Sequence, residues 1–274
     1  MSLLSSLAAA ELHISISAQP LFELFGVPVT NTMVTGIFGS FITFIILVFV
    51  ANKVRRGKYN RFVGLVQWVF EGLLGQIRGV IPDDKIARRI TPLAVTIFFF
   101  VLFNYWMSVI PGPESIFFKG VPLLRSMTAD LNFTLALALI TAISVQLYAI
   151  RQLTNKGNLG RYFRNPFKDP VGSFEGILEL VGEVSRLTAL ALRLFGNAFA
   201  GEILLIVIAI LTGYFASVAL PVFLGFELFI GFIQAYVFFM LTLIFTSLAV
   251  SHHGPESHDH PPVASTKKKA APQG

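Results

Sequence analysis

Cysteine is absent from the 274 residues of the chain, and charged residues make up only 13% of them. Without cysteine, neither disulfides nor thiolate metal sites can form. A soluble domain carries roughly a quarter charged residues, about twice the share found here. Apolar residues dominate instead, since 54% of the chain is hydrophobic and phenylalanine occurs 28 times. This composition excludes a soluble enzyme, a disulfide scaffold and a disordered chain, and it predicts a protein that crosses a membrane several times.

Sequence signatures of hydrolases are also absent. The chain has no GxxxxGK[ST] loop, which binds nucleotide phosphates, and no HExxH motif, which holds a catalytic zinc ion. It also has no GxSxG motif, which presents a serine nucleophile. We therefore expect no catalytic residue, no cofactor and no metal ion, and no hydrolysis of nucleotides or peptides by the chain itself. Four histidines near the C-terminus offer metal binding as an alternative, but a solvated tail is the favoured interpretation; they are His252, His253, His258 and His260.

Apolar runs of about 20 residues, enough to cross a bilayer as a helix, occupy residues 33–51, 90–110 and 131–150. From 173 to 250 the chain is almost continuously apolar, with one break at 211–213. This pattern predicts a hairpin of two helices, each of nearly 40 residues and roughly 60 Å long. Since the hydrocarbon layer is only about 30 Å thick, these helices must tilt strongly or lie partly along the surface.

Residues 62–81 have a different pattern. Apolar residues recur there at helical spacing, whereas Gln67, Glu71, Gln76 and Arg78 share the opposite side, as in a helix that lies in the membrane interface. The predicted fold is therefore an all-α polytopic membrane protein, with about five membrane helices and one interfacial amphipathic helix. Its segments are an outside N-terminal part (1–32), a single membrane domain (33–250) and a disordered cytoplasmic tail (251–274).

Basic residues are distributed unevenly between the two sides of such a protein. Of the 21 Lys and Arg residues, 17 lie in 52–89, 151–168 and the tail, whereas the opposite side has only Lys119 and Arg125. The positive-inside rule then places the N-terminus outside and the C-terminus in the cytoplasm or the mitochondrial matrix. The net charge of +6 mostly reflects this asymmetry, so no nucleic-acid partner is needed to explain it.

Two further arginines, Arg186 and Arg193, lie inside the first helix of the predicted hairpin. An arginine at the centre of a bilayer costs about 3 kcal/mol on insertion scales and more than 10 in simulations. Arginine cannot lose its proton to escape this cost. A chain that keeps Arg193 there is therefore predicted to use it for charge movement.

Helical spacing sorts the remaining polar groups of the hairpin. If the chain folds back at Gly213, residues whose numbers sum to about 427 lie at one level. Arg193 then lies opposite Gln234, and Glu202 lies opposite Glu227, nearer the outer side. The two levels are about 13 Å apart along the helix. The polar candidates sorted in this way are Arg193, Asn197, Glu202, Glu227 and Gln234, with Glu179 and Glu175 at the cytoplasmic end.

Each candidate also has a structural interpretation. Arg193 would neutralise a buried glutamate, and Glu202 and Glu227 would form a structural, partly protonated pair. The amides of Asn197 and Gln234 would join helices by hydrogen bonds. At the cytoplasmic end, Glu175 and Glu179 would face lipid headgroups, and for Arg186 an ion pair with nearby Glu183 is the favoured interpretation.

The run SRLTALALRLFGNAFAGEILLI (185–206) strongly resembles subunit a of the F-type ATP synthase, whose members carry an arginine in a similar LRLFGN-x-x-AGE string. A second run, GFIQAYVFFMLTLIF (231–245), is similar to the last helix of that family with its glutamine. The Asp130-Leu131-Asn132 sequence before the third apolar run is also similar. The likeness covers roughly residues 30–250 and is greatest to bacterial forms.

This resemblance implies a role for each candidate. Arg193 matches the essential stator arginine, and Glu202 and Glu227 match two polar positions of the outer half-channel. Asn197 and Gln234 match flanking amides, and Glu179 matches a polar position of the cytoplasmic half-channel. Two positions depart from the family pattern, because Glu227 stands where many bacterial relatives have histidine and Arg186-Leu187 replaces a frequent Lys-Pro.

The resemblance also implies partners and a location. The partners would be the ring of subunit c, subunit b of the peripheral stalk and the lipid bilayer, and the translocated ion would be H⁺, with Na⁺ as the alternative. The chain would be a non-catalytic subunit in the bacterial plasma membrane, or alternatively in the mitochondrial inner membrane. Rival interpretations are a secondary ion transporter with charges at the midplane, a membrane scaffold with structural ion pairs, and an intramembrane hydrolase, for which no motif is present.

Overall fold

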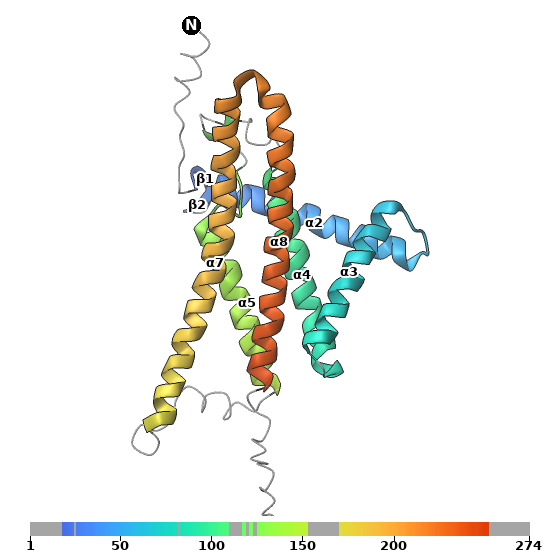
Figure 1. The fold of residues 1–274 in the computed structure, drawn as a ribbon, viewed down its shortest axis with the longest axis vertical. Helices are drawn as coiled ribbons and strands as arrows, with labels where there is room; N and C mark the ends of the chain where they lie inside the picture. Colours follow the sequence, from blue (N-terminus) through green and yellow to red (C-terminus); the bar gives the residue numbers. More distant parts are fainter. Residues whose placement is uncertain are drawn as a thin grey trace, which may run out of the picture.

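The computed structural model describes residues 18–24, 26–81, 83–109, 117–118, 121–122, 125–152 and 170–251. The predicted tail beyond Ser251, with its histidines, and the basic loop 153–168 lie outside these described residues. Long helices account for most of the described chain (Figure 1).

Four stretches of the described chain are long and apolar enough to span a membrane, which confirms the predicted all-α membrane fold. Three of them are single helices: α2 (Asn31–Arg55), α4 (Asp84–Val109) and α5 (Leu131–Gln152). The fourth, from Ser173 to Leu248, contains two helices. The chain is therefore a multi-pass membrane protein.

These two helices form the predicted hairpin. Helix α7 (Pro170–Thr212) and helix α8 (Ala216–Ser251) run side by side and are joined by the short 3₁₀ helix η2 (Gly213–Phe215) (Figure 1). Gly213 has a φ of +49°, a conformation that costs glycine least. The 43 residues of α7 are about 64 Å long, twice the thickness of the hydrocarbon layer, so the hairpin cannot stand upright in a bilayer.

Helix α2 runs across the direction of the hairpin (Figure 1). Its 25 residues, about 37 Å long, match a bilayer with modest tilt. A membrane orientation that suits α2 therefore lays the hairpin obliquely, which agrees with the tilt expected from its length.

The predicted amphipathic helix is α3 (Arg61–Val80). Val63, Val66, Leu73 and Ile77 on one face are buried, whereas Trp68 on another face is 75% exposed. Helix α4 begins six residues before the predicted run, because polar residues form its first turn. There the Asp83 carboxylate accepts a hydrogen bond from the Lys85 N–H at 2.8 Å, which caps the helix.

Two short β-hairpins were not predicted from the sequence. Strands β1 (Pro20–Leu24) and β2 (Val27–Thr30) pair antiparallel around Gly26, whose φ is +79°. Strands β3 (Phe117–Phe118) and β4 (Val121–Pro122) form a smaller pair. Strands this short have too few residues to show a period of two, so the sequence pattern does not reveal them.

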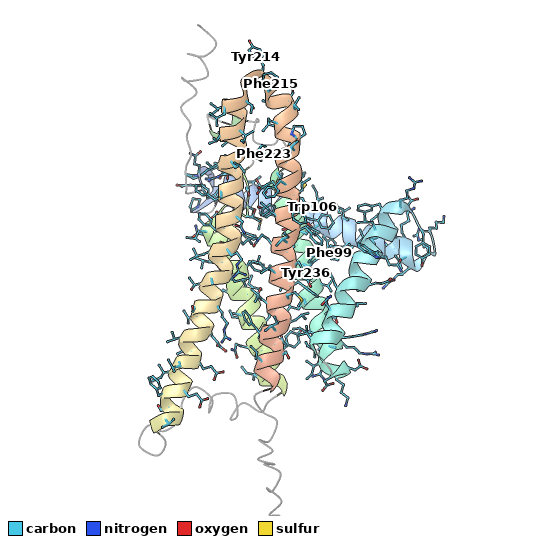
Figure 2. The ribbon with its side chains drawn as sticks, in the orientation of Figure 1. Phe99, Trp106, Tyr214, Phe215, Phe223 and Tyr236 are labelled. Carbon is cyan, nitrogen blue, oxygen red and sulfur yellow. The ribbon has the colours of Figure 1, made fainter. Side chains whose placement is uncertain are left out.

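The core lies where α4 and α5 pack against one side of the hairpin: α4 contacts α8, and α5 contacts both α7 and α8. The buried ring of Phe98 on α4 meets Phe232 and Phe239 of α8 edge to face, with centroids 6.0 and 6.2 Å apart. Phe99, Trp106 and Tyr236 lie in the same region (Figure 2). Other apolar side chains of the hairpin are exposed, such as Val222 at 69% and Phe229 at 58%.

Candidate functional site

Glu227 on α8 is buried, with 3% of its surface exposed. Its Oε1 accepts a hydrogen bond of 2.5 Å from the hydroxyl of Tyr105, which is fully buried on α4. On the next residue pair, the Trp106 indole N–H donates to the Leu228 carbonyl at 2.9 Å. These two bonds fix α4 against α8 and hold the Glu227 carboxylate in one orientation.

The Glu227 carboxylate also lies against α7. A Cβ atom added at Gly201 would overlap its Oε1, and would lie 2.6 Å from its Oε2. Only glycine therefore leaves room for the carboxylate at this position. Since Gly201 precedes Glu202, the structure brings Glu202 and Glu227 to the same level of the hairpin, as a turn at Gly213 predicts.

Glu202 pairs with an arginine rather than with Glu227. Its Oε1 lies 3.5 Å from Nε of Arg125, and both side chains are largely buried, at 19% and 8% exposed. Sequence reasoning considered Arg125 only as an outer-side charge and missed this contact. The available signal was that Arg125 is one of only two basic residues on the predicted outer side.

The segment that carries Arg125 is tied to the N-terminal end of α2. The Arg125 backbone N–H donates to Thr35 Oγ1 at 3.1 Å, and the Thr32 hydroxyl donates to Asp130 Oδ2 at 2.7 Å. The other oxygen of Asp130 accepts from the Asn132 N–H at 2.9 Å, at the start of α5. Helix α2 and the start of α5 therefore fix the segment that carries Arg125.

Two buried oxygens of the hairpin have no hydrogen-bond partner among the described residues. They are Oε2 of Glu202 and Oε1 of Gln234. Gln234 itself is 6% exposed. Buried polar atoms are nearly always hydrogen-bonded, so both oxygens are acceptors available to water or to a proton carrier.

Arg193 lies on an exposed face of α7. In the described part of the chain it forms no hydrogen bond or ion pair, so it does not neutralise a buried glutamate, and no hydrogen bond joins it to Gln234. Asn197, one turn further, is half-buried. Besides Asn197, the residues of this face one or two turns from Arg193 include three small ones: Ala189, Gly196 and Ala200.

A cavity of about 430 Å³ lies between α5, α7 and α8, toward the ends of α7 and α8 that are far from η2. Glu175, Glu179 and Glu183 line it together with Gln146 and Arg186. The structure thus brings both predicted cytoplasmic glutamates, Glu175 and Glu179, to one hollow. Their four-residue spacing, followed by Glu183, places all three on one face of α7.

Arg186 does not form the expected ion pair with Glu183 in the described structure. Its Nε donates to the Gly182 carbonyl at 3.1 Å, and its guanidinium lies 5.3 Å from the centre of the Phe245 ring. Glu183 instead accepts a hydrogen bond of 2.7 Å from Gln146 of α5. An arginine can stack on an aromatic face as well as pair with a carboxylate, and spacing on one helix does not reveal the ring of another.

Comparison with known proteins places this arrangement in a family. The family model described as "ATP synthase A chain" matches residues 32–247. A protein named ATP synthase subunit a from Mycobacterium ulcerans is 36% identical over 200 residues, which cover 69% of this chain and 77% of that protein. Proteins of the same name from Desulforamulus reducens and Marinomonas sp. are 33% and 30% identical, over 68% and 74% of this chain and over 66% and 76% of their own lengths. The chain therefore belongs to the ATP synthase A chain family and is a subunit a of the membrane sector, which takes part in proton transport and ATP synthesis.

Proposed function

We propose that the chain is the ion-translocating stator of the ATP synthase, with Arg193 as its fixed charge. The supporting observation is the exposure of Arg193 on a helix face whose exposed residues one and two turns away, Ala189 and Ala200, are small and apolar. An arginine facing hydrocarbon is costly, unless another subunit brings a carboxylate to it. The ring of subunit c supplies one such carboxylate per subunit as it turns past this face.

The charge of Arg193 would act on each passing carboxylic acid. At about 4 Å and an effective dielectric constant of about 20, a unit positive charge favours the ionised carboxylate by about 4 kcal/mol. This is enough to make the approaching acid release its proton. Ala189, Gly196 and Ala200 support this role, because small residues let a second helix approach closely.

The outer half-channel would pass Glu202 and Glu227, with the amides of Asn197 and Gln234 beside it. The buried oxygens of Glu202 and Gln234 that have no partner in the described part of the chain support this proposal, since a proton path needs acceptors that are not already occupied. The separate partners of the two carboxylates also support it. Glu202 is paired with Arg125 and Glu227 with Tyr105, so the two groups do not lock each other in a structural pair.

The cytoplasmic half-channel would leave past Glu179 and Glu175. The cavity lined by these residues supports it, because a cavity of about 430 Å³ lined by carboxylates has both the room and the polar partners that water needs. Glu179 and Glu202 are 14 and 9 residues from Arg193, about 21 and 13 Å along α7. Arg193 would therefore stand between two offset half-channels and prevent protons from passing directly between them.

The remaining assignments follow the same proposal. Subunit b contacts the chain as part of the stator, and the translocated ion is H⁺, with Na⁺ as the alternative. The chain is non-catalytic and lies in a bacterial plasma membrane, with its N-terminus outside and its C-terminus in the cytoplasm. Each proton that crosses 100 mV contributes about 2.3 kcal/mol, which drives the rotation of the ring.

Disulfide cross-linking tests whether the Arg193 face meets the ring. The chain has no cysteine of its own, so Ala189→Cys adds a single thiol one turn from Arg193. Oxidation of the assembled complex should join it to a cysteine placed beside the carboxylate of subunit c. Ala191→Cys is the matched control, because Ala191 is fully buried inside the chain. A cross-link from Ala191→Cys, or none from Ala189→Cys, would contradict the proposal.

A further inference from the structure

The contact between Arg125 and Glu202 involves a residue, Arg125, that the proposed half-channels do not include. It joins a buried guanidinium to a carboxylate of the proposed outer half-channel at 3.5 Å. Arg125 is 7% exposed as a whole residue and remains charged at any physiological pH. A buried arginine without a compensating charge is strongly destabilising, so its partner must stay within reach. The pair therefore fixes where the Glu202 side chain lies.

We propose that Arg125 is the positioning residue of the outer half-channel. It holds Oε1 of Glu202, so that Oε2 alone receives and releases the proton. Oε2 is buried and has no hydrogen-bond partner among the described residues. A carboxylate fixed through one oxygen presents the other in a constant direction, and proton transfer depends on such hydrogen-bond geometry. This inference rests on the proposed function, and it adds a residue contributed by the segment before α5.

The position of Arg125 does not depend on Glu202. Its backbone N–H is bound to Thr35 of α2, and Asp130, five residues later, is bound to Thr32 of the same helix. These bonds involve the backbone of residue 125 and other side chains. A substitution of the Arg125 side chain therefore leaves them in place and removes only what the guanidinium does.

A double-mutant cycle tests the proposal in the complete ATP synthase. Proton flux through the reconstituted complex is measured for the wild type, Arg125→Gln, Glu202→Gln and the double variant, each normalised to the amount of assembled complex. Arg125→Gln should lower the flux by about tenfold or more, the scale on which removal of an orienting group reduces activity. The double variant should be no slower than Glu202→Gln alone, because the proposed effect of Arg125 on the flux is exerted through Glu202.

Two further variants make the result specific. Arg125→Lys should recover part of the flux, since an ammonium keeps the charge but lacks the planar fork of the guanidinium. Arg78→Gln, at an exposed arginine of α3, should leave the flux unchanged. If Arg125→Gln fails to assemble, the double variant, which removes both buried charges, should restore assembly.

The possible outcomes separate this inference from the proposed function. Normal flux in Arg125→Gln beside reduced flux in Glu202→Gln overturns only the positioning role. Losses that multiply in the double variant, or assembly that the double variant does not restore, overturn it as well, because Arg125 would then act elsewhere. Normal flux in both Glu202→Gln and Arg193→Ala would overturn the proposed function itself.

Discussion

Replacing Gly201 with alanine should block the site without unfolding it. A Cβ atom at Gly201 would overlap the Glu227 carboxylate, and the end of a side chain can move more easily than a helix. We therefore expect Glu227 to turn away from Tyr105 while α7 and α8 stay in place.

The balance of free energies supports this expectation. Loss of the Tyr105–Glu227 hydrogen bond costs about 1.5–3 kcal/mol for a bond to a charged group. Alanine in place of glycine in a helix returns about 1 kcal/mol. The net destabilisation is about 0.5–2 kcal/mol, which an assembled complex tolerates. If the Tyr105-bound orientation is the one that conducts, a penalty of 1.5 kcal/mol or more reduces proton flux by at least about tenfold.

The assay is proton flux in vesicles together with the amount and melting temperature of the complex. Gly225→Ala is the matched control, because a Cβ at Gly225 of α8 meets no atom within 4 Å. It should conduct like the wild type. Wild-type flux in Gly201→Ala, or equal losses in both variants, would refute the reasoning from the close contact.

Two further predictions concern the other polar groups. Tyr105→Phe keeps the buried ring but removes the donor to Glu227, so proton flux should fall and the free energy of unfolding should drop by about 1.5–3 kcal/mol. Tyr236→Phe is the control, since the Tyr236 hydroxyl has no hydrogen bond among the described residues, and similar effects in both variants would contradict the prediction. Leu178→Cys, on the wall of the cavity between α5, α7 and α8, should react with a membrane-impermeant maleimide added from the cytoplasmic side. Leu180→Cys, at an exposed position of α7 outside the cavity, should react far more slowly. Equal reaction rates would show that the cavity holds no water.

Periodicity and charge revealed much of this fold. The long apolar runs predicted α2, α4, α5 and the hairpin, and the alternation of polar and apolar residues predicted α3. A turn at Gly213 predicted which residues of α7 and α8 lie at the same level of the hairpin. The close contact between Gly201 and the Glu227 carboxylate confirms this for that level. These features are local or depend on one turn, so the sequence alone determines them.

Contacts between distant segments could not be predicted in this way. Tyr105 reaches Glu227 across 122 positions of sequence, and Arg125 reaches Glu202 from outside the hairpin. Phe245 likewise takes the place expected for Glu183 beside Arg186. Which partner a buried charge finds depends on how helices pack, and a single sequence contains no direct record of that packing.

ATP-driven proton pumping in inverted membrane vesicles tests the central claim, that Arg193 is the fixed charge of the stator. Arg193→Ala is compared with the wild type and with Arg78→Ala, and assembly and ATP hydrolysis are measured in the same vesicles. We predict that Arg193→Ala alone abolishes pumping while the complex still assembles and hydrolyses ATP. Pumping at the wild-type rate in Arg193→Ala would contradict the account and its two half-channels.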